Sequence, residues 1–433
     1  MLKYLNGDQD KFLEKLDIIL SKRRVTNSTK LKVVKKIITD VKKNKDSALI
    51  KYERLFSKSK KISQKNIKFS KVEIKKIIKN LNKETKKSID IAYNRIYRFH
   101  KSQKLKNYKI KDSYNNYLSY KTSPIEKIGV YVPGGTSSYP STVLMNCIPA
   151  IIAGVKEIYM TTPSTADSFN PAVLYAAQKC KIKEIYKVGG AQAIAALSYG
   201  TKIIKKVNKI VGPGNEFVAL AKKEVFGDVG IDMIAGPSEV TVVADKYSNP
   251  AWVASDLIAQ AEHDVFAQSI LLTNDKNMIN KVNLSLKDQL RLLPKKKIAS
   301  KSLKRFGLAI FTKKKETLIN IINCIAPEHL EICFKNPEKL LSKIINAGSI
   351  FLGNYSPEAM GDYIAGPNHV LPTSGSAKFS SGLSIYDFLK RYSLIKISKT
   401  GIERLGPSVI NLAQYENLDG HANSVKIRLK RKT

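Results

Sequence analysis

Apolar residues recur every three or four positions through the first hundred residues of the chain. This spacing is shown by Phe12, Leu13, Leu16, Ile19 and Leu20, in a region from 9 to 105 that holds little Gly or Pro. An apolar stripe with this period indicates amphipathic helices that pack one face on a core. We therefore predict a helical N-terminal region.

From about residue 125, short β-rich runs alternate with helix-length segments. The predicted strands are 128–132, 158–161, 185–188 and 210–211, and the predicted helices are 142–155, 171–180, 192–199 and 215–226. This alternation predicts a parallel sheet covered by helices. Glycine-rich turns follow the strands at 133–135, 189–190 and 212–214. Ligands of open α/β sheets sit at the carboxyl ends of the strands, so these turns are candidate binding loops.

A second, looser α/β pattern follows. Its predicted strands are 239–244, 269–273, 308–312 and 349–352, and its predicted helices are 252–262, 278–290 and 316–324. Pro327, Glu328 and His329 are predicted to open a further helix. The last 50 or so residues show a mixed, less regular pattern, so we expect an irregular tail after two α/β units.

Length and composition place the chain among globular proteins of several domains. It has 433 residues, of which 43% are hydrophobic and 26% charged, and a chain of this length exceeds one ordinary core. No apolar run reaches the ~20 residues of a membrane helix. The first residues lack the apolar core of a signal peptide. We expect a cytoplasmic protein without a membrane partner, and its four cysteines are expected to be buried free thiols.

The formal net charge of +39 raises nucleic-acid binding as a competing function from another class. The excess is mostly lysine and is scattered along a chain that is also rich in Ile and Asn. Zinc-finger spacing, an RNP-type aromatic run and a KH-type loop are all missing. We therefore expect no nucleic-acid partner.

Histidine is scarce, with five in the chain, and one lies three residues after a glutamine. Gln260 and His263 end a predicted helix, and their spacing puts both on one helical face. An imidazole and an amide oxygen suit a borderline metal such as zinc. Two ligands do not make a site, however, and the pair taken alone favours a surface or capping histidine.

Two further segments combine carboxylates with histidines. Asp362 precedes His369 in a glycine-rich region, and Glu416 precedes His421 near the C-terminus. Loop carboxylates are usually solvated or cap a turn. Asp362 and His421 could also complete a four-ligand site with the Gln260 pair, although spacing alone does not show that these residues converge.

Glu328 and His329 are adjacent, and two interpretations stand equally. A glutamate in the first turn of a helix suits the helix dipole. Alternatively the two form an acid–base pair, since histidine titrates near neutrality and can take a proton from an alcohol during hydride transfer. The glycine turns are less informative: neither a GxGxxG nor a GxxxxGK[ST] motif occurs, so only a nonstandard dinucleotide site stays open.

Taken together, the motifs resemble those of the histidinol dehydrogenase family, in order from about residue 10 to the end. They are GVYVPGG (129–135), VGGAQAIAAL (188–197), KIVGPGN (209–215), IDMIAGPSE (231–239), QAEHD (260–264), APEHLE (326–331), GDY (361–363), NHVLPT (368–373), FSSGLS (379–384), YDF (386–388) and ENLDGH (416–421). The lysine-rich N-terminal helices match only loosely. Val265 stands where the family often has proline, which affects only the local loop.

The resemblance implies an enzyme that oxidises L-histidinol to L-histidine through histidinaldehyde, the last steps of histidine biosynthesis. It implies two NAD molecules in succession and one zinc ion per subunit. The implied zinc ligands are Gln260, His263, Asp362 and His421, and the implied acid–base pair is Glu328 and His329. The implied substrate contacts are Ser238, His369 and Glu416 together with the zinc ligands and His329. The implied cofactor contacts are Tyr131, Gln192 and Asn215.

The resemblance also implies an α/β fold with two incomplete Rossmann-like parallel-sheet units. Residues 1–124 would form the helical region, partly packed on the second unit. Residues 125–236 would form the cofactor-side unit, and 237–381 the unit with the metal and acid–base residues. Residues 382–433 would be a tail that reaches the partner subunit of an intertwined homodimer. The nearest alternative is a zinc-dependent dehydrogenase of this fold that acts on another amino alcohol or a polyol.

Overall fold

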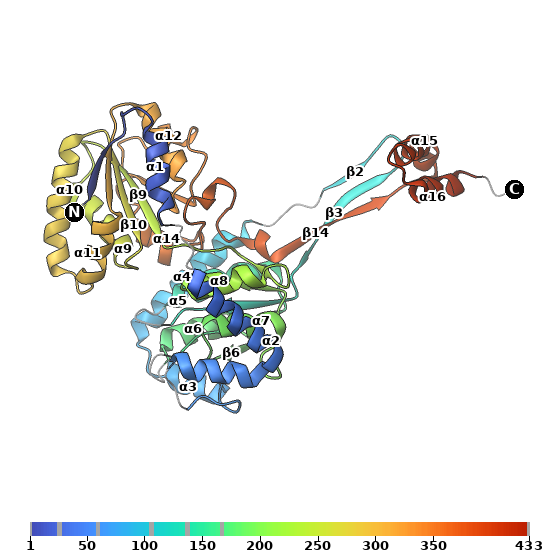
Figure 1. Ribbon diagram of the computed structural model, residues 1–433, viewed down its shortest axis with the longest axis horizontal. Coiled ribbons are helices and arrows are strands. Elements are labelled where there is room, and N and C mark those ends of the chain that lie inside the picture. The colour runs from blue at the N-terminus through green and yellow to red at the C-terminus, as the bar shows by residue number, and fades with distance from the viewer. Residues whose placement is uncertain are drawn as a thin grey trace.

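The computed structural model describes residues 2–23, 28–57, 61–103, 108–134, 139–164 and 169–430. Two helix-covered parallel sheets form the body, and an antiparallel arm that ends in two helices projects from it (Figure 1). The predicted fold class is confirmed. Gly135, which belongs to a predicted turn, lies outside the described residues. Over the described residues, no helix has both the length and the apolar character needed to cross a membrane.

The first unit is a five-stranded parallel sheet in the order β6-β5-β4-β7-β8. Its strands are β4 (Lys127–Tyr131), β5 (Glu157–Thr161), β6 (Glu184–Tyr186), β7 (Lys209–Val211) and β8 (Gly230–Ile231). Its helices are α5 (Pro140–Ala153), α6 (Pro171–Lys179), α7 (Gly190–Tyr199) and α8 (Glu216–Val225). The strand–helix alternation that the sequence shows between 128 and 226 is confirmed here.

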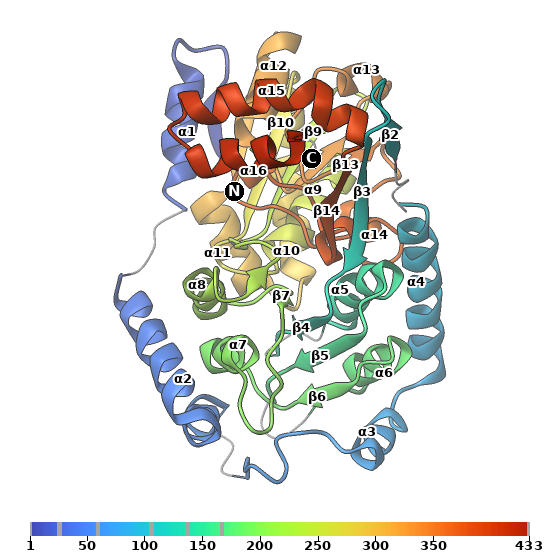
Figure 2. The same ribbon diagram turned by 90° about the vertical axis from the view of Figure 1, so that its right-hand side faces the viewer.

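The N-terminal helices divide between the two units. Most of them cover the first sheet, where α2 (Ser28–Ser57) packs on α7 and α8, α3 (Lys71–Ile78) on α6, and α4 (Lys83–Lys101) on α5. Figure 2 shows α2 and α4 on opposite sides of that sheet. Strand β1 (Lys3–Asn6) and helix α1 (Phe12–Ser21) instead join the second unit, where β1 pairs with β11 and α1 packs on α12.

The second unit is a six-stranded parallel sheet in the order β1-β11-β10-β9-β12-β13. Its other strands are β9 (Glu239–Ala244), β10 (Gln268–Thr273), β11 (Leu308–Phe311), β12 (His329–Ile332) and β13 (Ser349–Leu352). Its helices are α9 (Pro250–Ala261), α10 (Lys276–Leu292), α11 (Lys296–Phe306), α12 (Lys315–Ile325), α13 (Glu338–Leu341) and α14 (Glu358–Tyr363). The central strands β9 and β10 are buried along their whole length.

The helix predicted to open at Glu328 and His329 is wrong. Helix α12 ends at Ile325, and Ala326 adopts a left-handed conformation (φ 49°) that terminates it. His329 then begins β12, which lies between β9 and β13 in the sheet. All four residues of β12 are buried. The four residues alternate polar and apolar (HLEI), but so short a run directly after Pro327 is also compatible with the first turn of a helix.

The prediction of an irregular tail is also wrong. After two short 3-10 turns, η1 (Ser376–Lys378) and η2 (Ile385–Phe388), the chain forms β14 (Leu389–Lys396), α15 (Lys399–Tyr415) and α16 (Asp419–Leu429). β14 pairs antiparallel along eight residues with β3 (Tyr117–Pro124), which also pairs with β2 (Lys109–Lys111). The pairing joins segments about 270 positions apart in sequence. A local sequence pattern therefore cannot predict this pairing. β14 is also mostly exposed, so it lacks the buried apolar face that would mark it as a strand.

Candidate active site

Three elements of the second unit bring together the predicted acid–base residues and three of the four predicted metal ligands. Gln260 lies in the last turn of α9, and His263 follows just beyond that helix. His329 begins β12, and Asp362 lies in α14. Because His329 is the first residue of its strand, the site lies at the amino edge of this sheet. Ligand binding at the carboxyl ends of strands therefore does not describe the second unit.

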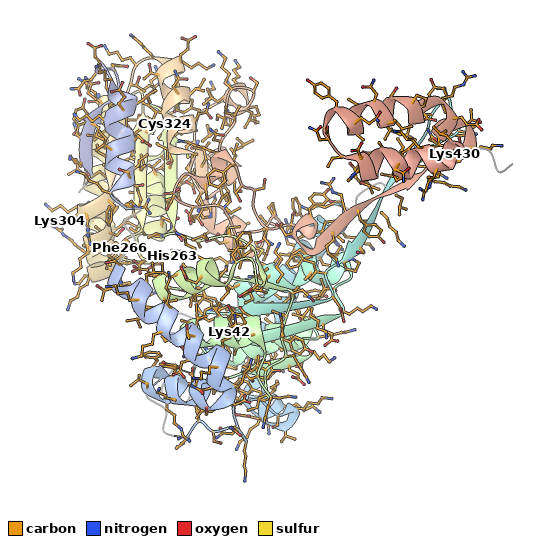
Figure 3. The ribbon with its side chains drawn as sticks, turned by 45° about the vertical axis from the view of Figure 1, so that its right-hand side comes forward. Lys42, His263, Phe266, Lys304, Cys324 and Lys430 are labelled. Carbon is orange, nitrogen blue, oxygen red and sulfur yellow. The ribbon has the colours of Figure 1, made fainter. Side chains whose placement is uncertain are left out.

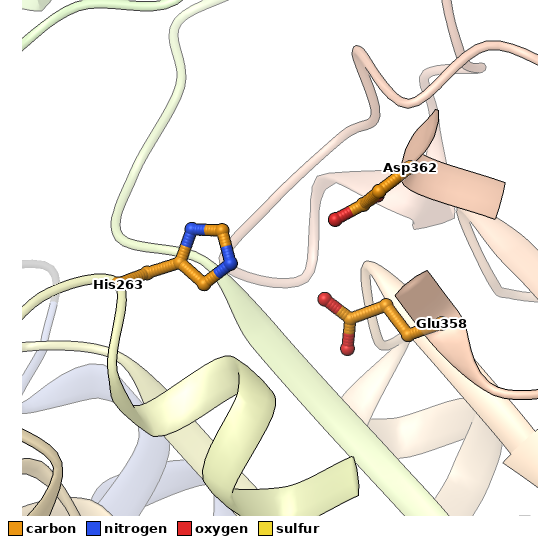
Figure 4. A group of neighbouring side chains, drawn as sticks. All are labelled: His263, Glu358 and Asp362. Atoms are coloured by element: carbon orange, nitrogen blue, oxygen red, sulfur yellow. The ribbon is translucent and has the colours of Figure 1, made fainter. Parts of the chain in front are cut away.

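Within the described part of the chain, one group of histidine and carboxylate side chains is spaced to hold a metal ion. It consists of His263, Glu358 and Asp362, whose ligand atoms all lie within 4.8 Å of one another (Figure 4). Gln260 borders the group. With its amide nitrogen facing Glu358, it donates to the two carboxylate oxygens at 2.9 and 3.2 Å. This orientation leaves the Gln260 amide oxygen as the possible ligand atom.

Sequence analysis missed Glu358. It lies one helical turn before Asp362, so both carboxylates project from the same face of α14. Its side chain is only 3% exposed, and its backbone N–H donates to Glu331 at 2.6 Å. The i,i+4 spacing of Glu358 and Asp362 was the available signal, but the helix that gives the spacing meaning is only six residues long.

Glu328 and His329 are buried side by side and share one backbone partner. The N–H of Glu239 donates to Glu328 Oε2 at 2.9 Å, and its carbonyl oxygen lies 3.3 Å from His329 Nδ1. A carbonyl oxygen can only accept, so Nδ1 carries the proton. His329 Nε2 has no hydrogen-bond partner among the described residues and lies 3.6 Å from Asp362 Oδ1.

Burial and neighbouring charges both shift the pKa values of this cluster, and for His329 the two effects oppose each other. Burial raises the pKa of Glu328 to about 7 and that of Glu358 to about 8. Burial alone lowers the pKa of His329, but the carboxylates of Glu358, Glu328 and Asp362 outweigh it and raise that pKa above its ordinary value. A buried group of carboxylates that stabilises positive charge this strongly is an environment suited to a cation.

A cavity of about 390 Å³ opens beside this cluster. It is lined by His329, Asp362 and His369 together with Phe351, Tyr355 and neighbouring residues. His369 Nδ1 lies 2.9 Å from the Asp362 carbonyl oxygen, which fixes the imidazole at the cavity wall. Ser238, the remaining predicted substrate contact of the body, directly precedes β9 and so lies next to Glu239.

The structure does not bring Glu416 and His421 into this cluster. Glu416 follows α15 and His421 lies in α16, and both are exposed. The two helices sit at the end of the arm, which projects away from both parallel sheets (Figure 1). In Figure 3, Lys430 marks the end of α16 on the arm, whereas His263 lies in the body.

The predicted cofactor contacts lie at the carboxyl edge of the first sheet. Tyr131 ends β4, Gln192 lies in the first turn of α7 after β6, and Asn215 caps α8 after β7. The Tyr131 hydroxyl accepts a hydrogen bond from the Gly190 N–H at 3.0 Å. Gly212 (φ 111°), in the turn after β7, lies directly against the Tyr131 backbone. A Cβ at position 212 would lie 2.2 Å from the Tyr131 carbonyl oxygen, so the close approach requires glycine.

Glu53 of α2 is a second residue that sequence analysis missed. Its carboxylate accepts from Gln192 Nε2 at 3.0 Å and from the Gly189 N–H at 3.1 Å, and it is 1% exposed. Glu53 is one of three acidic residues in a long lysine-rich helix, and nothing in the sequence marks this contact, which spans more than 130 positions. Glu53 thereby fixes both the start of α7 and the Gln192 side chain.

The donor set fits zinc. An imidazole nitrogen, a carboxylate and an amide oxygen are N and O ligands that zinc accepts, and a catalytic zinc keeps at least one further position for water or substrate. The cluster adjoins a cavity, so ligands from outside can reach it. The orphaned His329 Nε2 lies on the same side, next to Asp362.

Comparison with known proteins gives one consistent result. Residues 20–429 match the family model described as histidinol dehydrogenase. The chain is 56% identical over 435 residues to histidinol dehydrogenase of Pelagibacter ubique, covering both proteins completely. It is 44% identical to that of Acinetobacter baylyi, covering 99% of this chain and all of the relative. The crystal structure of histidinol dehydrogenase from Elizabethkingia anophelis superposes with a TM-score of 0.93 at 40% identity, covering 99% and 98% of the two chains.

Proposed function

The chain belongs to the histidinol dehydrogenase family, and we propose that it oxidises L-histidinol to L-histidine through histidinaldehyde, using two NAD molecules in succession and one zinc ion per subunit. One observation carries the proposal: His329, with an unpartnered and buried Nε2, lies beside Asp362 in the group that is spaced to hold a metal. Alcohol oxidation by hydride transfer needs a base for the hydroxyl proton, and this nitrogen lies where a cation-bound substrate would be held.

Gln260, His263 and Asp362 would hold the zinc ion, with His421 as the fourth ligand. When bound, zinc would fix the amine and imidazole of the substrate by coordination, while NAD supplies the hydride acceptor. Ser238, His369 and Glu416 would contact the substrate. His369 is already fixed at the cavity wall by Asp362, so it can orient a polar substrate without further rearrangement.

His329 acts as the base of the alcohol stage. Its Nδ1–H faces the Glu239 carbonyl oxygen, which leaves Nε2 free to take the hydroxyl proton. Hydride leaves at the same time from the carbon that bears this hydroxyl. The product of this stage is the aldehyde.

Glu328 acts as the base of the aldehyde stage. Its Oε2 is held by the Glu239 N–H, so the second oxygen can take a proton from the water that adds to the aldehyde carbon. The resulting hydrate would give its hydride to the second NAD and one hydroxyl proton to a base, and the acid so formed releases its remaining proton as the carboxylate of L-histidine. A pKa of about 7, raised by burial, suits a general base that works near neutral pH.

Tyr131, Gln192 and Asn215 would bind NAD at the carboxyl edge of the first sheet. The turns after β6 and β7 meet there, and Glu53 and Gly190 fix two of these side chains in place. We further propose that the enzyme is a homodimer whose arm delivers Glu416 and His421 to the partner's site, since these residues are distant from the cluster in their own chain.

The test is NADH formation by the purified protein. L-Histidinol with NAD should give about two NADH per histidine formed, and removing metal with a chelator should abolish the reaction until zinc is restored. Other amino alcohols and polyols are tested in parallel. They distinguish the proposed enzyme from a zinc-dependent dehydrogenase of this fold that acts on one of those substrates. A product that stops at the aldehyde, or a preferred substrate other than L-histidinol, would reject the proposal.

A further inference from the structure

Arg23 connects the N-terminal segment to the start of two central strands. It follows α1, and its side chain is 3% exposed. Its guanidinium donates to Glu239 Oε2 at 2.7 Å and to Gln268 Oε1 at 2.6 Å. It also donates to the carbonyl oxygens of Pro237 and Ser238, at 2.9 and 3.4 Å. The Arg23 side chain thus binds the segment that leads into β9 through both its backbone carbonyl oxygens and the Glu239 carboxylate.

That segment is the one that positions the acid–base pair. The Glu239 N–H holds Glu328 and the Glu239 carbonyl oxygen faces His329 Nδ1, at 2.9 and 3.3 Å. A shift of this single residue would therefore move the contacts of both groups at once. The side chain of Glu239 is itself 4% exposed, and Arg23 is its ion-pair partner among the described residues.

The geometry of these contacts requires a guanidinium. Arginine presents several N–H donors in a fixed plane, so it can bridge a carboxylate, an amide and two carbonyl oxygens together. A lysine at position 23 would supply the positive charge from one point and could not span the same acceptors. Methionine would supply neither charge nor donors, and would leave the Glu239 carboxylate buried without a counter-ion.

We propose that Arg23 is a positioning residue for the reaction, acting through the backbone of Glu239 on Glu328 and His329. The inference rests on the proposed function for the identity of the reaction. It assigns Arg23 no contact with substrate, zinc or NAD. Loss of the guanidinium should therefore lower turnover much more than substrate affinity, for which Ser238 is the one proposed contact in this segment, and should leave metal content in place.

The experiment compares Arg23→Met, Arg23→Lys and the double variant Arg23→Met/Glu239→Gln with the unaltered enzyme. Arg291→Met is the matched control, because Arg291 is 68% exposed and its ion pair among the described residues is with the surface residue Asp288. We expect Arg23→Met to lower kcat at least tenfold with KM for L-histidinol changed less than threefold and zinc content unchanged. Arg23→Lys should lie between this variant and the unaltered enzyme, and the control should match the unaltered enzyme.

The double variant separates charge from position. It removes the unpaired buried carboxylate, so its thermal stability should recover relative to Arg23→Met. Its kcat should stay low, because the carbonyl oxygens of Pro237 and Ser238 still lack their donor. Recovery of kcat in the double variant, or full kcat in Arg23→Lys, would overturn the inference by showing that only the charge on Glu239 matters.

A spectroscopic measurement keeps the inference separate from the proposed function. In protein carrying ¹⁵N-histidine, the His329 signals are assigned from the His329→Asn variant among only five histidines. Arg23→Met should shift the His329 Nδ1 signal, and Arg291→Met should not. An unchanged His329 spectrum would overturn the positioning inference even in an active enzyme. If the unaltered protein fails to oxidise L-histidinol, the proposed function fails, and this spectrum still decides whether Arg23 positions His329.

Discussion

Gln260 contacts Glu358, a member of the group spaced to hold a metal, with the amide nitrogen 2.9 and 3.2 Å from the two carboxylate oxygens. The contact decides which atom of Gln260 is available as a ligand, because the nitrogen is engaged and the oxygen is not. Glu358 thereby orients a ligand without itself having to bind metal. Groups that orient ligands in this way commonly change metal affinity when they are removed.

The first prediction tests this orientation. Glu358→Ala frees the Gln260 amide to rotate, so we expect zinc affinity to fall roughly 10- to 100-fold. The measurement is competition for zinc against a chelator of known affinity. Glu338→Ala, at an exposed position of α13, is the control and should retain zinc. Unchanged retention in Glu358→Ala would show that the oxygen of Gln260 is oriented by other contacts.

The second prediction concerns the base of the alcohol stage. His329→Asn should lower turnover of L-histidinol by ~10²–10⁴-fold, the usual worth of a general base. Zinc should stay bound, because Gln260, His263 and Asp362 are unaltered. The measurement pairs steady-state kinetics with metal analysis of the same preparation. A parallel loss of zinc and activity would make His329 a ligand or a structural residue instead.

The third prediction is a pH dependence of the aldehyde stage. Burial raises the pKa of Glu328 to about 7, and the carboxylate is the form that takes a proton from water. The rate of histidinaldehyde oxidation should therefore rise with pH as Glu328 loses its proton. A nearby bound dication favours the carboxylate, so the midpoint should lie at or below about 7. Glu328→Gln should remove this stage, and an unchanged pH profile in that variant would exclude Glu328 as the base.

The fourth prediction concerns the cofactor side. Glu53→Ala leaves Gln192 Nε2 and the Gly189 N–H without their acceptor, and a hydrogen bond to a charged group contributes about 1.5–3 kcal/mol. If the loss of one such hydrogen bond weakens NAD binding by this free energy, KM for NAD should rise roughly 10- to 100-fold, while KM for L-histidinol stays unchanged. Glu316→Ala, an exposed residue of α12, is the control. Equal changes in both KM values would indicate general loosening of the fold.

Most of the two α/β units can be predicted from local patterns in the sequence, but the candidate active site can be predicted only in part. The bounds of Glu239–Ala244 and Ser349–Leu352 are predicted to the residue, because each is a short, mainly apolar run bounded by turn residues. The prediction of a helix at β12 is wrong for a different reason: its polar–apolar alternation covers only four residues and follows Pro327, which is typical of a first helical turn. β3 and β14 escaped notice because their partners are remote in sequence.

The residues that hold the predicted site residues were the least visible in the sequence. Glu358, Glu53 and Arg23 each act on a partner through a contact that only the tertiary structure creates. Acidic and basic residues are common in this chain, so none of the three differs from its neighbours by type. Family motifs identified the groups proposed for chemistry, whereas the groups that support them required coordinates.

The last prediction concerns the arm. His421 is exposed on α16, and the arm carries exposed apolar residues, including Ile395 at 69% and Leu412 at 63%. Apolar surface of this kind marks a site of association, and a symmetric dimer would carry each arm to the other subunit's site. His421→Asn should then weaken zinc retention about as much as His263→Asn does, since each removes one ligand from the same set.

Mixing the two inactive chains decides whether the sites are shared. If the arm of one subunit completes the site of the other, a mixed dimer of His263→Asn and His421→Asn chains carries both defects at one site and none at the other. Random pairing makes half of the dimers mixed, each with one intact site, so roughly a quarter of full activity should return. If each site were built from a single chain, every site would keep one defect. Mass spectrometry establishes that subunits have exchanged, and exchange without recovery would place His421 in the site of its own subunit.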